Sequence, residues 1–183
     1  MSAYKLSERF IQFKEYCRVK GCDNVEGGLE FHTVRGYQLL NQGNNPLTPA
    51  MEDYLEMIYR NIQKSGYMRI NTLSELLNVK PSSATKMVQN LTQLDFLNYK
   101  KYGIIFLTDR GALIGKFLLD RHNIIERFLT MLGINEDALV ETELIEHNIS
   151  ANTTNTINIL NEFWAQNPDL LKKFEEFKSS FKY

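Results

Sequence analysis

The chain has 183 residues, of which 43% are hydrophobic and 23% are charged, and its formal net charge is −1. These values are ordinary for a globular protein of one or two domains, and no internal repeat or low-complexity tract appears. No apolar run is long enough to span a bilayer and no signal-peptide pattern is present, so we expect a cytoplasmic protein without a membrane partner. Cys17 and Cys22 are too few for a disulfide framework, which fits a reducing compartment.

The charge is unevenly distributed along the chain. Residues 1–46 carry a net charge of +1, residues 47–108 carry +2, and residues 109–183 carry −4. The middle part therefore mildly favours an anionic partner, and the last part favours cations.

The first 46 residues give the weakest structural signal. Helical spacing of aromatic residues predicts a helix over residues 4–21, whereas residues 27–46 show no clean period and end in the boundary signal "NQGNNP". We expect residues 1–46 to form an N-terminal extension of unknown role.

Residues 47–108 show the element order of a winged helix-turn-helix domain. A helix is predicted over residues 47–66, with Thr48 as N-cap, Pro49 in the first turn and Gly66 as the stop. A short helix over residues 71–78, with a capping box of Thr72 and Glu75, precedes a second helix over residues 79–96. Residues 97–108 then predict a β-hairpin wing around "KKYG".

The second helix of this domain has the composition of a surface that reads double-stranded DNA. With Met87, Val88, Leu91 and Leu94 turned to the core, the outward side chains are mostly small hydrogen-bonding groups that fit a major groove, and the wing adds lysines for phosphate oxygens. The predicted DNA-binding residues are Ser82, Ser83, Thr85, Lys86, Gln89, Lys100 and Lys101. Winged helices also serve as protein-interaction modules, and this alternative stays open on the pattern alone.

The remainder of the chain, residues 109–183, is predicted to be a second, all-helical domain, so the fold class is mostly α. Helices are expected over residues 109–133, 135–150, 153–168 and 169–181, with Asn135 capping the second of them. The apolar faces of residues 112–132 and 137–149 are the expected contact of a homodimer.

The stretch "VETELIEHNIS", residues 140–150, carries the clearest candidate chemistry. Glu143, Glu146 and His147 stand at helical spacing on one face, and oxygen and nitrogen ligands of this kind suit a divalent transition metal. Asp53 and Glu56 likewise share a helix face, and His122 stands among apolar residues. Solvated acidic faces and an ordinary half-buried histidine are the alternative explanations.

In their order and spacing, "MEDYLEMIY", "KPSSATKMVQNL", "LTDRGALIGKFLLDRH" and "IEHNIS" resemble the diphtheria-toxin-repressor family of metal-dependent transcriptional regulators, most of all its manganese branch. The resemblance covers residues 47 to about 180 and implies repression of metal-uptake genes by a homodimer bound to a palindromic operator. It implies metal ligation by Asp53, Glu56, His122, Glu143, Glu146 and His147, in a binuclear Mn(II) site. Asp53 stands where iron-type relatives carry methionine, which favours Mn(II), although Fe(II) and other divalent metals remain alternatives.

Two further interpretations compete with a metal-responsive regulator. A di-metal carboxylate enzyme would use paired Glu-x-x-His motifs on a four-helix bundle, and a hydrolytic zinc site would use His-Glu-x-x-His, which is absent. We therefore expect no catalytic residues. The second competitor is a winged-helix protein whose DNA affinity does not depend on metal.

Overall fold

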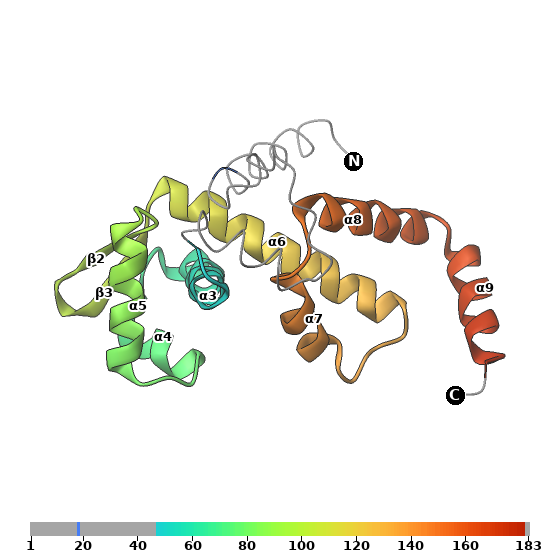
Figure 1. The fold of residues 1–183 in the computed structure, drawn as a ribbon, viewed down its shortest axis with the longest axis horizontal. Coiled ribbons are helices and arrows are strands. Elements are labelled where there is room, and N and C mark those ends of the chain that lie inside the picture. The colour runs from blue at the N-terminus through green and yellow to red at the C-terminus, as the bar shows by residue number, and fades with distance from the viewer. Residues whose placement is uncertain (1–17, 19–46, 182–183) are drawn as a thin grey trace, which may run out of the picture. The chain divides into compact units, whose positions relative to one another are not determined.

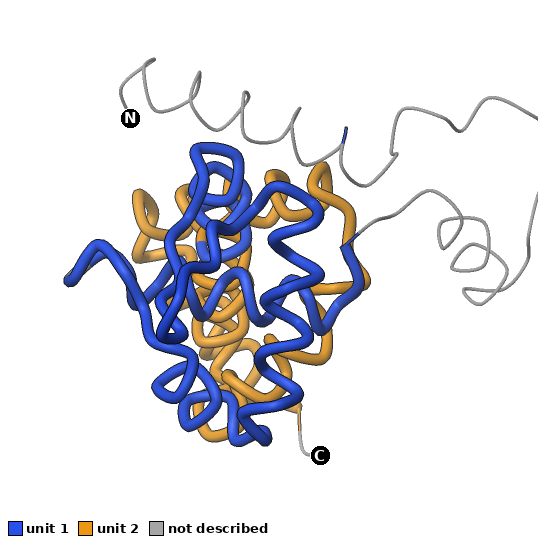
Figure 2. Tube along the Cα trace, turned by 90° about the vertical axis from the view of Figure 1, so that its left-hand side faces the viewer, with its two compact units in different colours: residues 1–119 blue, residues 120–183 orange. Residues whose placement is uncertain are grey.

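The computed structural model describes residue 18 and residues 47–181. The extension predicted for residues 1–46, with its expected helix over residues 4–21, lies outside these residues except for Arg18. The chain divides into two compact units, residues 1–119 and residues 120–183, coloured separately in Figure 2. The boundary between the units falls inside helix α6, Asp109–Met131.

The first unit has the expected helix-turn-helix and wing (Figure 1). Its helices are α3 (Pro49–Ser65), α4 (Ile70–Leu76) and α5 (Pro81–Gln93), followed by the first part of α6. Its strands are β1 (Met68–Arg69), β2 (Leu97–Lys100) and β3 (Ile104–Leu107), and the 3-10 turn η1 (Lys101–Gly103) joins the last two. The mostly helical fold class is confirmed.

Local signals at both ends of α3 act as predicted. The Thr48 hydroxyl accepts a hydrogen bond from the Met51 backbone nitrogen at 3.4 Å, Pro49 occupies the first turn, and Gly66 ends the helix with a φ of 75°. Positive φ at that position suits glycine, which has no Cβ. The inward face of α3 buries Leu55 and Ile58 completely.

The start of α4 differs from the prediction. The helix begins at Ile70, Arg69 holds the N-cap position without a side-chain cap, and Thr72 lies inside the helix, so the capping box of Thr72 with Glu75 was wrong. Met68 and Arg69 pair with Ile105 and Ile104 of β3, which makes a three-stranded antiparallel sheet in the order β1-β3-β2. The chain therefore passes directly from a strand into the helix, and a two-residue strand is too short to show a sequence period.

The second unit contains the rest of α6 together with α7 (Ala138–Glu146), α8 (Ala151–Gln166) and α9 (Pro168–Ser179). Ile125 and Leu129 of α6 form a core with Ala138 of α7. Trp164 of α8 stacks between Phe128 and Phe174, with ring centroids 6.1 and 6.0 Å away. Helix α7 is thereby packed onto α6, and this packing positions the candidate site.

The ends of α7 also differ from the prediction. Asp137, not Asn135, precedes the helix, and no side-chain cap forms there. The helix ends at Glu146, earlier than the predicted end at residue 150. Ser150 adopts an extended conformation and instead caps α8, where its side chain accepts a hydrogen bond from the Thr153 nitrogen at 3.1 Å. Within the part of the chain that the structure describes, no helix has both the length and the apolar character needed to cross a membrane.

Candidate metal centre and nucleic-acid interface

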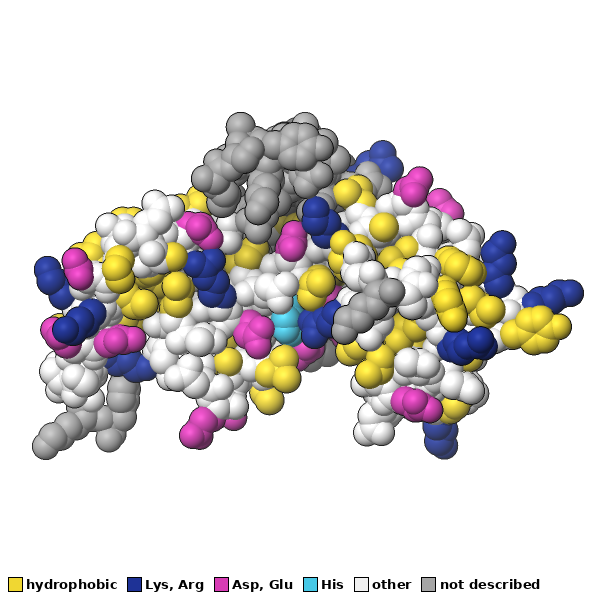
Figure 3. Space-filling view, turned by 180° about the vertical axis from the view of Figure 1, so that it is seen from behind, with side chains coloured by type: hydrophobic (Ala, Val, Ile, Leu, Met, Phe, Trp, Pro, Cys, Tyr) yellow, Lys and Arg dark blue, Asp and Glu magenta, His cyan; other side chains and the backbone are white. Residues whose placement is uncertain are grey.

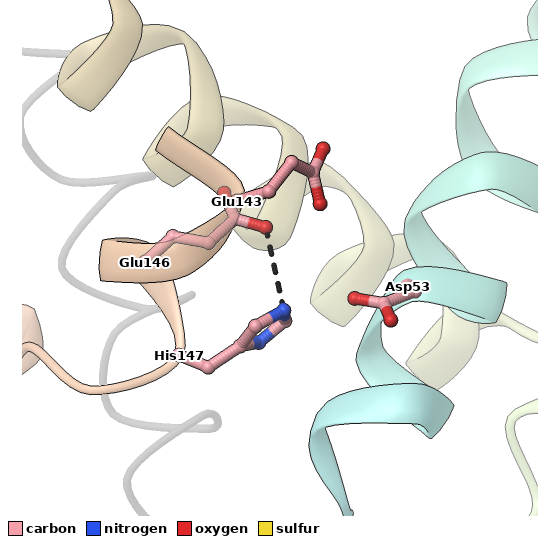
Figure 4. A group of neighbouring side chains, drawn as sticks. All are labelled: Asp53, Glu143, Glu146 and His147. Carbon is pink, nitrogen blue, oxygen red and sulfur yellow. Dashed lines mark ion pairs between the residues drawn. The ribbon is translucent and has the colours of Figure 1, made fainter. Parts of the chain in front are cut away.

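Four of the six predicted ligands lie together in the second unit. His122 Nδ1 of α6 is 3.1 Å from Glu146 Oε2 and 3.6 Å from Glu143 Oε1. His147 Nε2 is 3.6 Å from Glu146 Oε1, and Figure 4 shows the Glu146 carboxylate pointing toward this imidazole. The helical spacing of Glu143 and Glu146 places both on one face, and His147 keeps right-handed helical angles at the C-cap of α7.

Burial separates these side chains from ordinary surface charges. His122 is 2% exposed and Glu146 is 1% exposed, whereas the Glu143 side chain is 51% exposed. A buried carboxylate loses hydration and needs a compensating partner such as a cation or a hydrogen-bond donor. A solvated acidic face is therefore the wrong explanation for Glu146, while Glu143 lies on the open side of the cluster.

Sequence reasoning missed Arg121, which lies within the same cluster. Its side chain is 2% exposed, and its Nη2 atom lies 3.3 Å from Nδ1 of His147. The sequence pattern did not single it out, because Arg121 stands in a run of four polar residues, Asp120 to Asn123.

The other two predicted ligands, Asp53 and Glu56, lie on α3 in the first unit, and Figure 4 also draws Asp53. Glu56 is buried and accepts a hydrogen bond at Oε1 from Nη2 of Arg60, 2.5 Å away. Burial, and secondly the Asp53 carboxylate, raise the pKa of the neighbouring Tyr54 phenol above its usual 10.0. The carboxylate and imidazole donors on both units have the chemistry that divalent cations such as Mn(II) accept.

The predicted DNA-contacting side chains are mainly at the surface of α5 and the wing. Ser82, Ser83, Lys86 and Gln89 are exposed, as are Lys100 and Lys101. Thr85 is half-buried, and its hydroxyl donates its hydrogen bond to the Pro81 carbonyl oxygen at 2.8 Å. In this conformation the hydroxyl can only accept a further hydrogen bond, for example from a donor on a base edge.

The opposite face of α5 packs inward, and the wing ends in an exposed aromatic residue. Val88 and Leu91 are buried as predicted, Ala84 is buried as well, and Met87 and Leu94 are only half-buried. Tyr102 is 90% exposed at the tip of the wing. Basic and hydrophobic side chains project together from that end of the molecule at the right of Figure 3.

Two family models match the chain, one after the other. The model described as "Iron dependent repressor, N-terminal DNA binding domain" matches residues 46–105. The model described as "Iron dependent repressor, metal binding and dimerisation domain" matches residues 108–175.

Curated relatives and solved structures agree with these models. The chain is 43% identical over 133 residues to the HTH-type transcriptional regulator MntR of Lysinibacillus sphaericus (strain C3-41), covering 72% of this chain and 96% of that protein. It is 42% identical over 130 residues to MntR of Listeria innocua serovar 6a, covering 70% and 92%. The crystal structure of T. acidophilum IdeR matches with a TM-score of 0.52 and 26% identity, over 58% of this chain and 51% of that one. The structure of ScaR with bound Zn²⁺ matches with a TM-score of 0.51 and 28% identity, over 62% and 54%.

These matches and the fold define a metal-dependent, DNA-binding transcriptional repressor that acts as a homodimer on operator DNA. The chain belongs to the iron-dependent repressor family, as its motifs indicated. It is a transcriptional regulator and not an enzyme, so the di-metal carboxylate enzyme is excluded.

Proposed function

We propose that this chain is a cytoplasmic, Mn(II)-responsive repressor that binds palindromic operators of metal-uptake genes as a homodimer when metal is abundant. The observation that carries the proposal is the buried pair of His122 and Glu146 beside His147, in the unit that contains most of the match to the metal-binding model. The manganese assignment draws on the relatives named MntR and on the family motifs.

The proposed ligands are His122, Glu143, Glu146 and His147 of the second unit with Asp53 and Glu56 of the first, arranged as a binuclear site. A carboxylate-rich donor set with imidazole suits Mn(II), whereas a thioether in place of Asp53 would favour a softer metal. Fe(II) is the second candidate, because raw affinity rises from Mn(II) to Fe(II) in sites of this kind.

The bound ions would supply positive charge that offsets the repulsion among the carboxylates. Metal binding is then transmitted through the ligands of this chain. Asp53 and Glu56 belong to the helix that begins the proposed DNA-binding domain, residues 47–108. The other four ligands belong to the proposed metal-binding and dimerisation domain, residues 109–183. Ligation from both domains favours one arrangement of the two α5 helices in a dimer, about 34 Å or one DNA turn apart. A coupling of about 1–3 kcal/mol between metal and DNA gives a 5- to 150-fold change in DNA affinity.

Exposed apolar side chains indicate where the second copy binds. Leu139, Val140 and Leu144 of α7 are more than half exposed, and Ile159 and Phe163 of α8 add to the same unit. Hydrophobic side chains gather on the part of the surface that belongs to α8 and α9 at the left of Figure 3. The sequence predicted that the apolar face of residues 112–132 contributes to the dimer contact. Ile114, Leu118 and Leu129 of this segment are already buried within the single chain. We therefore propose that α7 and α8 supply most of the dimer contact.

Fluorescence anisotropy with labelled promoter fragments of metal-uptake genes tests the proposal. The full chain is titrated in Mn(II), Fe(II) or Zn(II), each with a chelator control. We expect at least fivefold tighter DNA binding with Mn(II), reversed by the chelator. DNA affinity that a chelator leaves unchanged would support the metal-independent alternative, and a stronger response to Fe(II) at equal free concentration would support the iron-responsive one.

A further inference from the structure

Arg121 is a buried cation placed directly against a proposed metal ligand. Its Nη2 atom lies 3.3 Å from His147 Nδ1, and its side chain is 2% exposed. A guanidinium keeps its proton at every physiological pH and has donors only, so Nδ1 of His147 must be the acceptor in this contact. In a neutral imidazole the proton then resides on Nε2, the atom that faces Glu146 Oε1 at 3.6 Å.

This arrangement conflicts with metal ligation through either ring nitrogen. A metal ion takes a lone pair of a neutral imidazole. Ligation through Nδ1 would take the lone pair that Arg121 now uses. Ligation through Nε2 would move the ring proton to Nδ1, and two donors would then face each other across the contact with Arg121. In both cases the hydrogen bond between Arg121 and His147 must break.

We propose that Arg121 is a positioning residue that competes with the metal ion for His147, holding the imidazole in the metal-free protein and releasing it on metal binding. The proposal rests on the proposed metal-responsive function and deepens it, because it names a side chain that sets the metal concentration at which the repressor responds. The guanidinium charge acts in the same direction as the hydrogen bond, since it repels a divalent cation in the cluster.

The competing role and a merely supporting role make opposite predictions. If Arg121 only braces the cluster, its removal loosens the ligands and weakens metal binding. If Arg121 competes with the ion, its removal tightens metal binding. A charge-assisted hydrogen bond is strong enough to change the Kd for metal by about tenfold, which corresponds to about 1.4 kcal/mol.

The experiment measures the Kd for Mn(II) from the electron paramagnetic resonance signal of the free ion, with the full chain. The test variant is Arg121→Met, which keeps the length of the side chain, and Arg121→Lys retains a buried charge in case the methionine variant does not fold. The control is Arg127→Met on the same helix, because Arg127 pairs with Glu162 at 2.8 Å near the surface. Circular dichroism of the metal-free proteins checks folding.

We expect Arg121→Met to bind Mn(II) about tenfold more tightly than the wild type, Arg121→Lys to fall between them, and Arg127→Met to match the wild type. Nitrogen-15 shifts of the metal-free wild type should show His147 protonated at Nε2, and loading with diamagnetic Cd(II) should shift the Arg121 side-chain signals. A folded Arg121 variant with unchanged or weaker Mn(II) binding would overturn the proposal, as would a proton on Nδ1 in the metal-free protein. A wild type that binds no Mn(II) would instead refute the proposed function on which the proposal rests.

Discussion

Replacing Glu146 with glutamine separates the ligand role of this residue from its structural role. Glu146 is 1% exposed, with Oε2 3.1 Å from His122 Nδ1. Glutamine has nearly the same shape and retains a hydrogen bond to His122, so the free energy of unfolding of the metal-free protein should change by about 1 kcal/mol or less. Removing a residue that only supports a metal ligand can weaken metal affinity by up to about 100-fold. Loss of a direct anionic ligand should therefore weaken Mn(II) binding by about 100-fold or more, which corresponds to about 2.7 kcal/mol.

The DNA response gives the readout. In the wild type, saturating Mn(II) should raise operator affinity by about 5- to 150-fold, and at the same Mn(II) concentration the Glu146→Gln variant should show a rise of less than about twofold. The matched control is Glu162→Gln, because Glu162 also pairs with a cation, Arg127, but near the surface. A Glu146→Gln variant that responds to Mn(II) as the wild type does, while Glu162→Gln behaves normally, would refute the ligand role of Glu146.

Three further predictions address metal choice, DNA contact and folding. Asp53→Met should shift the preference in DNA-binding titrations from Mn(II) toward Fe(II), and a retained Mn(II) preference would count against Asp53 as the selecting residue. Lys101→Ala should weaken binding to all DNA sequences alike and, with two protomers, reduce the slope of log K against log salt by about 1.8; an unchanged slope would remove Lys101 from the interface. Gly111→Ala should destabilise the chain by about 1–3 kcal/mol in denaturant titrations. An added Cβ there would lie 1.9 Å from the Phe96 carbonyl oxygen, and an unchanged midpoint would contradict this close approach.

Elements with strong local signals could be predicted from the sequence. Thr48, Pro49 and Gly66 define the ends of α3 through interactions within a few residues, so no tertiary information was needed. Thr72 with Glu75 matched a capping pattern equally well, yet the pairing of Met68 with Ile105 in β3 decided where α4 begins. That pairing joins residues far apart in the sequence and overrides the local preference.

The candidate site shows the same division between local and tertiary information. The helical spacing of Glu143 and Glu146 was enough to place both carboxylates on one face. The position of His122 beside them depends on the packing of α6 against α7, and the family motif supplied it where spacing did not. Arg121 was missed for this reason, because its contact with His147 follows from that packing and leaves no periodic trace in the sequence.

Anomalous diffraction at the manganese edge, from crystals of the full chain grown with Mn(II), tests the central claim most directly. The account predicts anomalous peaks in contact with the carboxylate of Glu146 and with the imidazoles of His122 and His147, with Asp53, Glu56 and Glu143 completing the ligand set. Manganese peaks confined to other side chains, with these six residues free of metal, would contradict it.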